Sequence, residues 1–292
     1  MSISFLWQLK YMWNNRRALR SPEDYVKFLG ECAAAPEAAY FPQNSARAGD
    51  YPEGPDGGWR YDFTRLPAHD KLLKAYKLDE IAGQGSAFDR ALRLMDWLSA
   101  HTWYNGMSIW SARLPDDGLK ILRYAHNRSF GRCLNCRHKA IALADCLRAA
   151  GMAAMPVGFC NYTYRPGEEK VIPTPNHLTV HLWLPEERRW VMLDPSFNSY
   201  VTDENGRALN LIEIQKRHRQ GEPLSVARYA LNGTQDFRAG YLNGFVLGSL
   251  LEIVTLGGAC RLLPGDVPRK DDDKARALTV AELLAEPNIK EP

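Results

Sequence analysis

Apolar residues in the middle of the chain recur at the spacing of helices. One stripe begins after Ser86 and consists of Phe88, Ala91, Leu92, Met95 and Leu98. A second, weaker pattern covers residues 114–125. The third covers residues 136–150, where apolar side chains surround most of the helix, and Gly151 follows as a C-terminal cap. Asn135 precedes this stretch and is suited to cap its N-terminus. We therefore predict three helices, of which the third is buried and central.

The chain after Gly151 has the patterns of strands. Residues 152–163 form an apolar run, and residues 177–184 alternate strictly between two faces. One face of that second strand consists of His177, Thr179, His181 and Trp183. A third strand, residues 189–193, follows a turn and ends at Asp194-Pro195, because proline cannot continue a hydrogen-bonded ladder. Helices followed by an antiparallel sheet predict an α+β fold.

The rest of the chain elaborates this core, which we place at residues 85–200. Residues 1–84 are expected to form an N-terminal helix and a wrapping segment that is rich in Pro and Gly. Residues 201–292 are expected to form a helical elaboration and a charged tail from Arg269. We expect the three parts to pack as one compact unit.

Two helices are expected in the C-terminal elaboration. One covers residues 209–219, and the other covers the apolar stretch 241–256. The second stretch is shorter than the roughly 20 residues that cross a bilayer, and it contains Asn243 and Glu252. We therefore expect a buried helix there, and no membrane as a partner.

Composition narrows the classes of function. Hydrophobic residues make up 45% of the chain and charged residues 24%, which is ordinary for a globular protein. The net charge of +3 is too small to favour nucleic acid as a partner. Six cysteines in 292 residues are too few for a disulfide scaffold. Because residues 1–10 lack the pattern of a secretory signal, we expect a cytoplasmic protein.

Three residues can be brought together by local geometry. Cys136 begins the buried helix, where free backbone N–H groups and the helix dipole stabilise a thiolate and an oxyanion. A four-residue hairpin loop after residue 184 would place Asp194 opposite Thr179, on the same face as His177. Cys136, His177 and Asp194 can therefore form a nucleophile, a base and a group that orients the base.

These blocks resemble the transglutaminase-like superfamily of papain-like thiol enzymes. Its nucleophile opens a helix with the pattern C-x-x-x-A that ends near L-R-A-x-G, as residues 136–151 do here. Its histidine opens a strand that leads to L-P, a Trp and then D-P-[TS], as residues 177–196 do. The family's usual Gly two residues before the nucleophile is Leu134, and G-x-C fits Cys133 instead. The interval to Gly151 favours Cys136 as the nucleophile.

The resemblance implies a papain-like core in which the Cys136 helix packs on an antiparallel sheet. It also implies thiol acyl transfer on an amide or thioester substrate, with water or an amine as the acceptor, and no cofactor or metal. Trp103 and Asn135 are candidates for a second oxyanion donor or a pocket wall. The slightly basic charge would suit an acidic carrier protein as a partner.

Other interpretations stay open at this stage. The chain could be an amide-bond-forming synthase of a natural-product assembly line, or an inactive binding module with the same fold. Cys133 and Cys136 could be half of a zinc site or a redox dithiol, although no second ligand pair has the required spacing. His181 lies on the same strand face as His177 and is a rival base.

Overall fold

The structure is a computed structural model that describes the chain in several stretches. They are residues 63–106, 114–126, 132–160, 177–232, 242, 246, 252–256, 275–277 and 280–287. The helix expected over residues 1–20, most of the wrapping segment and the tail at 269–274 lie outside the described residues.

Five helices precede the sheet within the described residues. They are α3 (Pro67–Tyr76), α4 (Leu78–Ala82), α5 (Ala87–His101), α6 (Gly118–Ala125) and α7 (Cys136–Ala149). The three predicted helices are thus confirmed as α5, α6 and α7. Each begins at a polar cap: the side chains of Ser86, Asp117 and Asn135 accept hydrogen bonds from the backbone N–H groups of the first turns.

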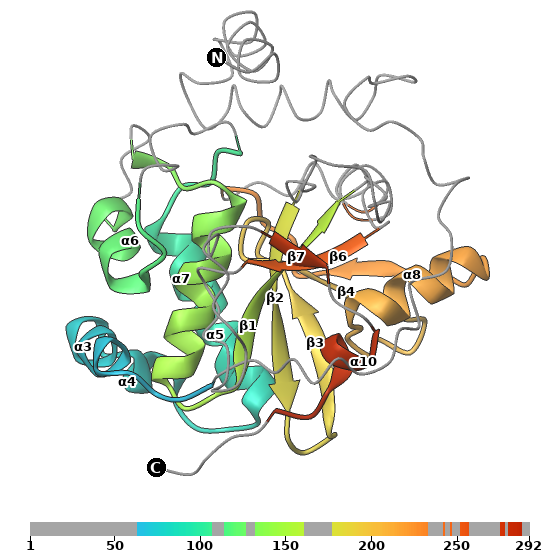
Figure 1. Ribbon diagram of the computed structural model, residues 1–292, viewed down its shortest axis with the longest axis horizontal. Coiled ribbons are helices and arrows are strands. Elements are labelled where there is room, and N and C mark those ends of the chain that lie inside the picture. The colour runs from blue at the N-terminus through green and yellow to red at the C-terminus, as the bar shows by residue number, and fades with distance from the viewer. Residues whose placement is uncertain are drawn as a thin grey trace, which may run out of the picture.

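The central sheet has the strand order β3-β2-β1-β6-β7, and neighbouring strands in it are antiparallel (Figure 1). Its strands are β1 (Ala154–Cys160), β2 (His177–Leu184), β3 (Arg189–Leu193), β6 (Glu252–Leu256) and β7 (Ala275–Ala277). The α+β class is therefore confirmed.

The helix expected over residues 241–256 is wrong at its C-terminal end. Residues 252–256 form β6, which pairs with β1 from Cys160 opposite Glu252 to Val157 opposite Thr255. A short apolar run such as residues 252–256 fits a helix or a strand equally well by periodicity. Its three central residues, Ile253-Val254-Thr255, are β-branched, which favours a strand. The C-terminal elaboration is therefore mixed, and it completes the central sheet.

A second layer covers the face of the sheet away from α7. It includes β4 (Tyr200–Thr202), α8 (Leu211–Arg219), β5 (Ser225–Ala227) and α10 (Val280–Leu284), and Figure 1 shows α8 and α10 across the sheet from helices α3–α7. One core cluster joins α7 to Leu178, Val180, Leu182 and Leu184, and the other contains Trp183, Trp190, Met192 and Leu211. Because both faces are covered, all eight residues of β2 are buried.

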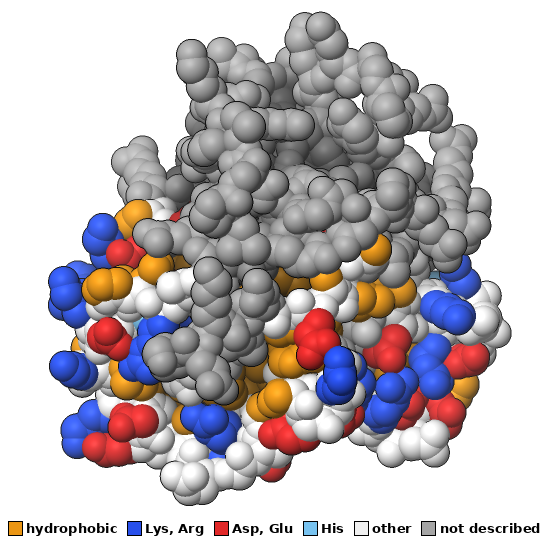
Figure 2. Space-filling view, turned by 60° about the horizontal axis from the view of Figure 1, so that its bottom comes forward, with side chains coloured by type: hydrophobic (Ala, Val, Ile, Leu, Met, Phe, Trp, Pro, Cys, Tyr) orange, Lys and Arg blue, Asp and Glu red, His pale blue; other side chains and the backbone are white. Residues whose placement is uncertain are grey.

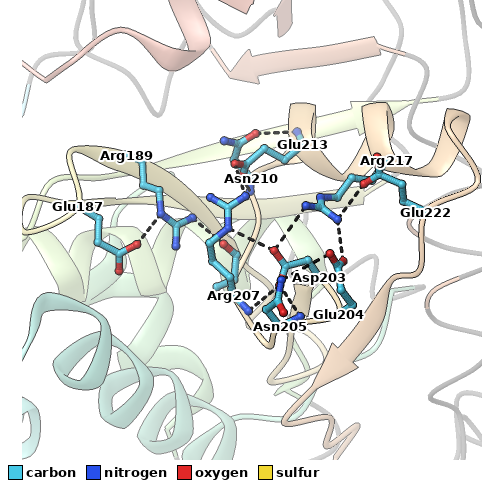
Figure 3. Close-up of polar contacts among 11 residues, drawn as sticks. Glu187, Arg189, Asp203, Glu204, Asn205, Arg207, Asn210, Glu213, Arg217 and Glu222 are labelled. Carbon is cyan, nitrogen blue, oxygen red and sulfur yellow. Dashed lines mark hydrogen bonds and ion pairs between the residues drawn. The ribbon is translucent and has the colours of Figure 1, made fainter.

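The turn between β4 and α8 is held by a network of charged and polar side chains (Figure 3). Asp203 Oδ1 accepts the backbone N–H groups of Asn205 and Arg207 at 3.0 and 2.9 Å. Its other oxygen faces Arg207 and Arg217 at 3.3 and 3.6 Å. Asn210 and Glu213 form a reciprocal capping box at the start of α8. This network fixes residues 203–213, the segment between β4 and α8 together with the first turn of α8.

The described surface mixes charges of both signs. Figure 2 shows Lys and Arg side chains interspersed with Asp and Glu side chains over the described part of the face in view. Of the helices that the structure describes, none has both the length and the apolar character needed to span a membrane.

Asp145, in the middle of α7, ties this helix to α3 and α6. Its Oδ2 accepts the backbone N–H of Gly118 at 2.8 Å, and its Oδ1 lies 3.6 Å from His69 Nε2 and is hydrogen-bonded to Arg148. Burial by itself would raise the pKa of Asp145, but the contacts with His69, Arg148 and Gly118 outweigh it and lower the pKa. The carboxylate therefore stays ionised between the helices.

Gly118 leaves room for this carboxylate. A Cβ added at Gly118 would lie 2.7 Å from Asp145 Cβ and 2.8 Å from its Oδ2. We expect Gly118→Ala to destabilise the fold by about 1–3 kcal/mol, as overpacking of a buried site does. Urea unfolding measures this change. Lys120→Ala, at an exposed position of the same helix, should stay within about 0.5 kcal/mol of the wild type. Equal stability of both variants would contradict the prediction.

Candidate active site

Cys136 is the first residue of α7 and lies where the two cores meet. Asn135 Oδ1 caps the helix by accepting the His138 N–H at 3.1 Å. The cap fixes the first turn, so that its backbone N–H groups point past the N-terminus. Cys136 is half-buried, and it packs against both core clusters. A side chain on a helix of one layer can therefore reach groups on the opposite face of the sheet.

His177 and Asp194 form a buried pair on that opposite face. His177 Nε2 lies 2.6 Å from Asp194 Oδ2, and both side chains are nearly or fully inaccessible. The second oxygen, Oδ1, accepts the backbone N–H of Ser196 at 2.9 Å. The strand pairing agrees with the predicted hairpin, because Leu184 lies opposite Arg189 and Val180 opposite Leu193.

The thiol of Cys136 acts on the same imidazole. Together with Asp194 it raises the pKa of His177. Since Asp194 occupies Nε2, Nδ1 is the ring nitrogen that remains for the thiol. Burial by itself would lower the pKa of His177, but the charge and hydrogen bond of Asp194, together with Cys136, raise it to about 10. The imidazole therefore keeps its proton at neutral pH.

Cys133 and His181, the alternative candidates for nucleophile and base, are both buried. Cys133 is 2% exposed, and burial raises the pKa of its thiol to about 12. His181 shares the strand face of His177, as predicted, but burial lowers its pKa to about 3. Its ring stacks on Trp190 at 6.3 Å, and its Nε2 accepts the backbone N–H of Leu211 at 3.4 Å. His181 is thus a neutral core residue that packs under the second layer.

The two pocket candidates have different positions. The Oδ1 of Asn135 is engaged as the helix cap and also lies 2.8 Å from His138 Nδ1. Trp103 is half-buried, and its carbonyl accepts the backbone N–H of Leu134 at 2.9 Å. Leu134 is two residues before Cys136, so the Trp103 backbone runs beside the chain that enters α7.

Arg137 and Lys139 follow Cys136 in the first turn of α7, and each side chain contacts another part of the protein. Arg137 makes a two-point contact with Asp116 through Nε and a terminal nitrogen. Lys139 is 1% exposed, and its Nζ donates to the Thr102 carbonyl at 3.3 Å. The latter contact ties the first turns of α7 to the segment that leads to Trp103.

Sequence reasoning missed the support behind the imidazole. Phe197 is fully buried, with its ring centroid 5.6 Å from that of His177 and 5.4 Å from that of Tyr104. Its backbone lies in a turn that two hydrogen bonds between Asp194 and Ser199 close. The aromatic residue after D-P-S was visible in the sequence, but only the turn directs it towards His177.

The metal and dithiol interpretations gain no support. Within the described ranges, no group of three or more His, Cys, Asp or Glu side chains is arranged to hold a metal ion. Cys133, Cys136 and Cys146 are free thiols.

Comparison with known proteins agrees with the fold and the motif order. Residues 75–195 match the family model of the transglutaminase-like superfamily, and this stretch includes Cys136, His177 and Asp194. This part of the chain is therefore similar to the transglutaminase-like superfamily, and its fold is α+β. Neither the curated proteins nor the solved structures include a significant match to the chain.

Thiol reactivity tests which cysteine the fold activates. We expect a limiting dose of iodoacetamide at about pH 6.5 to label Cys136 first, because this thiol is half-buried at a helix start whereas Cys133 and Cys146 are buried. Peptide mapping by mass spectrometry identifies the labelled cysteine. The Cys136→Ser variant should lose this early label. Early labelling of Cys133 would contradict the arrangement.

The protonation of His177 tests its coupling to Asp194. In Asp194→Asn the charge is removed while burial remains, so the pKa of His177 should fall from about 10 to below its ordinary value of 6.5. At pH 7 the imidazolium should then become neutral, as read from the ring nitrogen shifts of ¹⁵N-histidine-labelled protein. Asp70→Asn removes an exposed carboxylate on α3 and should leave this titration unchanged. An imidazole that stays charged in Asp194→Asn would refute the coupling.

Proposed function

We propose that this protein is a cysteine-dependent acyl-transfer enzyme that acts on amides or thioesters as a hydrolase or acyltransferase. The observation that carries the proposal is the buried His177–Asp194 pair, 2.6 Å apart, in which the pKa of His177 is raised by Asp194 and by the Cys136 thiol at the start of α7. A buried imidazole and carboxylate beside a thiol are the parts that nucleophilic catalysis needs.

In the proposed reaction, the Cys136 thiolate attacks the carbonyl carbon of the substrate. The carbon–sulfur bond forms while the carbonyl oxygen becomes an oxyanion. As this intermediate collapses, the bond to the leaving amine or thiol breaks, and the imidazolium of His177 gives its proton to that group. Water or an amine then attacks the acyl carbon and transfers a proton to His177. The carbon–sulfur bond breaks, the acid or amide leaves, and the thiolate and imidazolium are restored.

Asp194 acts through His177 in this proposal. Its Oδ2 faces Nε2, so the hydrogen bond holds Nδ1 toward the thiol and stabilises the imidazolium. Asp194 is itself held, because Oδ1 accepts the Ser196 N–H.

The oxyanion would form at the N-terminus of α7, where backbone N–H groups have no partner within the helix. Asn135 supports this site as the cap that fixes the first turn. The Trp103 segment runs beside it and is the proposed source of the second donor or the pocket wall. No cofactor or metal takes part in this proposal.

An inactive binding module is the weaker hypothesis. Taking a carboxylate and a histidine out of water is unfavourable unless each has a partner. A module that only binds would have no chemical need for this buried pair beside a free thiol. The two hypotheses differ in whether Cys136 becomes acylated.

The test is to incubate the protein with S-acetyl-N-acetylcysteamine and follow acetylation of Cys136 by intact mass and peptide mapping. We expect His177→Ala to lower the acylation rate by about 10³ to 10⁶-fold, as loss of a catalytic base does. Asp194→Asn should lose less, because it only orients the base, and His181→Ala should lose least. No adduct on Cys136 in the wild type would overturn the proposal.

The same experiment distinguishes the acceptors. With an added primary amine at about millimolar concentration, amide product would favour an amide synthase, since such a site must exclude water. Free acid alone would favour a hydrolase. An acidic carrier protein, proposed from the net charge, would be supported if a carrier-bound thioester acylated Cys136 faster than the free thioester.

A further inference from the structure

A short segment after β5 reaches both halves of the candidate site. Residues 229–232 lie outside the stretch that matches the transglutaminase-like family. Tyr229, Leu231 and Asn232 are buried, with 1%, 0% and 9% exposure. A segment of the C-terminal elaboration is thus packed into the interior rather than laid over the surface.

The Asn232 side chain binds the backbone of Tyr104. Its Oδ1 accepts the Tyr104 N–H at 2.8 Å, and its Nδ2 donates to the Tyr104 carbonyl at 2.8 Å. The side-chain amide of Asn232 thereby pairs with both the backbone N–H and the backbone carbonyl of a residue 128 positions away. The two hydrogen bonds together fix the position and the orientation of the Tyr104 backbone, as pairing with a neighbouring strand would.

The other edge of the same backbone pairs with Leu134, two residues before Cys136. Leu134 donates its N–H to the Trp103 carbonyl at 2.9 Å, and its carbonyl accepts the Asn105 N–H at 2.9 Å. This is a parallel bridge between Tyr104 and Leu134. Residues 103–105 are therefore held between Asn232 on one side and the chain that enters Cys136 on the other.

The same segment also supports the imidazole half of the site. The backbone N–H of Ala230 donates to the Phe197 carbonyl at 2.8 Å, and the Tyr229 ring stacks on Phe197 at 5.8 Å. Phe197 in turn packs against His177. One short segment thus contacts the backbone beside Cys136 and the aromatic residue behind His177.

We propose that residues 229–232 form a positioning element of the acyl-transfer site, in which Asn232 sets the place of residues 103–105 relative to Cys136. This inference rests on the proposed function. Residues 103–105 are hydrogen-bonded to Leu134, two residues before Cys136, and in this inference they wall the place of the substrate carbonyl. A displacement of about 1 Å in such a wall can cost about 100-fold in rate. Asn232 acts through Tyr104, so it is a positioning residue and not a catalytic one.

Two reagents separate positioning from simple stability. Iodoacetamide reacts with the Cys136 thiolate by displacement of iodide at a saturated carbon, and no oxyanion forms. p-Nitrophenyl acetate acetylates the same sulfur through a tetrahedral oxyanion, with p-nitrophenolate as the leaving group. A misplaced wall slows only the second reaction, whereas a general loss of structure changes both.

The test variant is Asn232→Gly. Asn232 has a φ of 50°, which glycine adopts without strain, so the substitution removes the two side-chain hydrogen bonds and leaves the backbone conformation available. Lys77→Gly is the matched control, because Lys77 also has a positive φ, of 53°, and lies exposed at the end of α3. Both variants replace a residue in the left-handed backbone conformation with glycine, but only Asn232→Gly removes a contact with Tyr104.

We expect Asn232→Gly to acetylate about 10-fold or more slowly than the wild type, with alkylation by iodoacetamide within about twofold. Lys77→Gly should match the wild type in both reactions. Acetylation of Asn232→Gly within twofold of the wild type would overturn the inference, and so would an equal loss in both reactions.

A second variant covers the case in which Asn232→Gly does not fold. Asn232→Asp keeps the shape and the acceptor for the Tyr104 N–H, but it loses the donor to the Tyr104 carbonyl. Its acetylation should also fall while alkylation persists, and wild-type acetylation would again overturn the inference. Failure of the proposed function is distinct, because the wild type itself would then not be acetylated on Cys136.

Discussion

The buried contact between His177 and Asp194 is the constraint on which the arrangement of this protein depends. An imidazole and a carboxylate that have 1% and 0% exposure are tolerated only with partners within hydrogen-bond distance. The pair requires one register of β2 against β3, since a shift by one residue would turn one of the two side chains to the other face. It also requires a second layer over that face, which β4, α8 and α10 help to supply.

Cys136 is fixed by a different set of contacts on the other side of the sheet. Asn135 caps the first turn of α7, and Asp145 anchors the middle of the helix to Gly118 and His69. Because α7 is an apolar helix surrounded by α3, α5, α6 and the sheet, its axis cannot shift without opening the core. The Cys136 thiol and the His177 ring are therefore held by separate layers and meet where the two cores join.

The C-terminal elaboration belongs to this arrangement. Strand β6 extends the central sheet beside β1, and the segment that follows β5 packs between the Cys136 side and the His177 side. The stretch that matches the transglutaminase-like family ends at residue 195, before these parts. The family motif thus includes the three candidate residues, and residues 229–232, outside it, contact Tyr104 and Phe197.

The sequence alone determined the features that depend on local spacing. The period of the apolar residues and the polar caps located α5 and α7, and strand alternation placed His177 and Asp194 on one face. Only the tertiary structure decided that residues 252–256 form a strand, that His181 is a core residue, and that Asn232 binds Tyr104. Each of these three features depends on which distant segment of the chain packs beside the residue concerned. Local periodicity carries no information about such contacts, because they form between residues that only folding brings together.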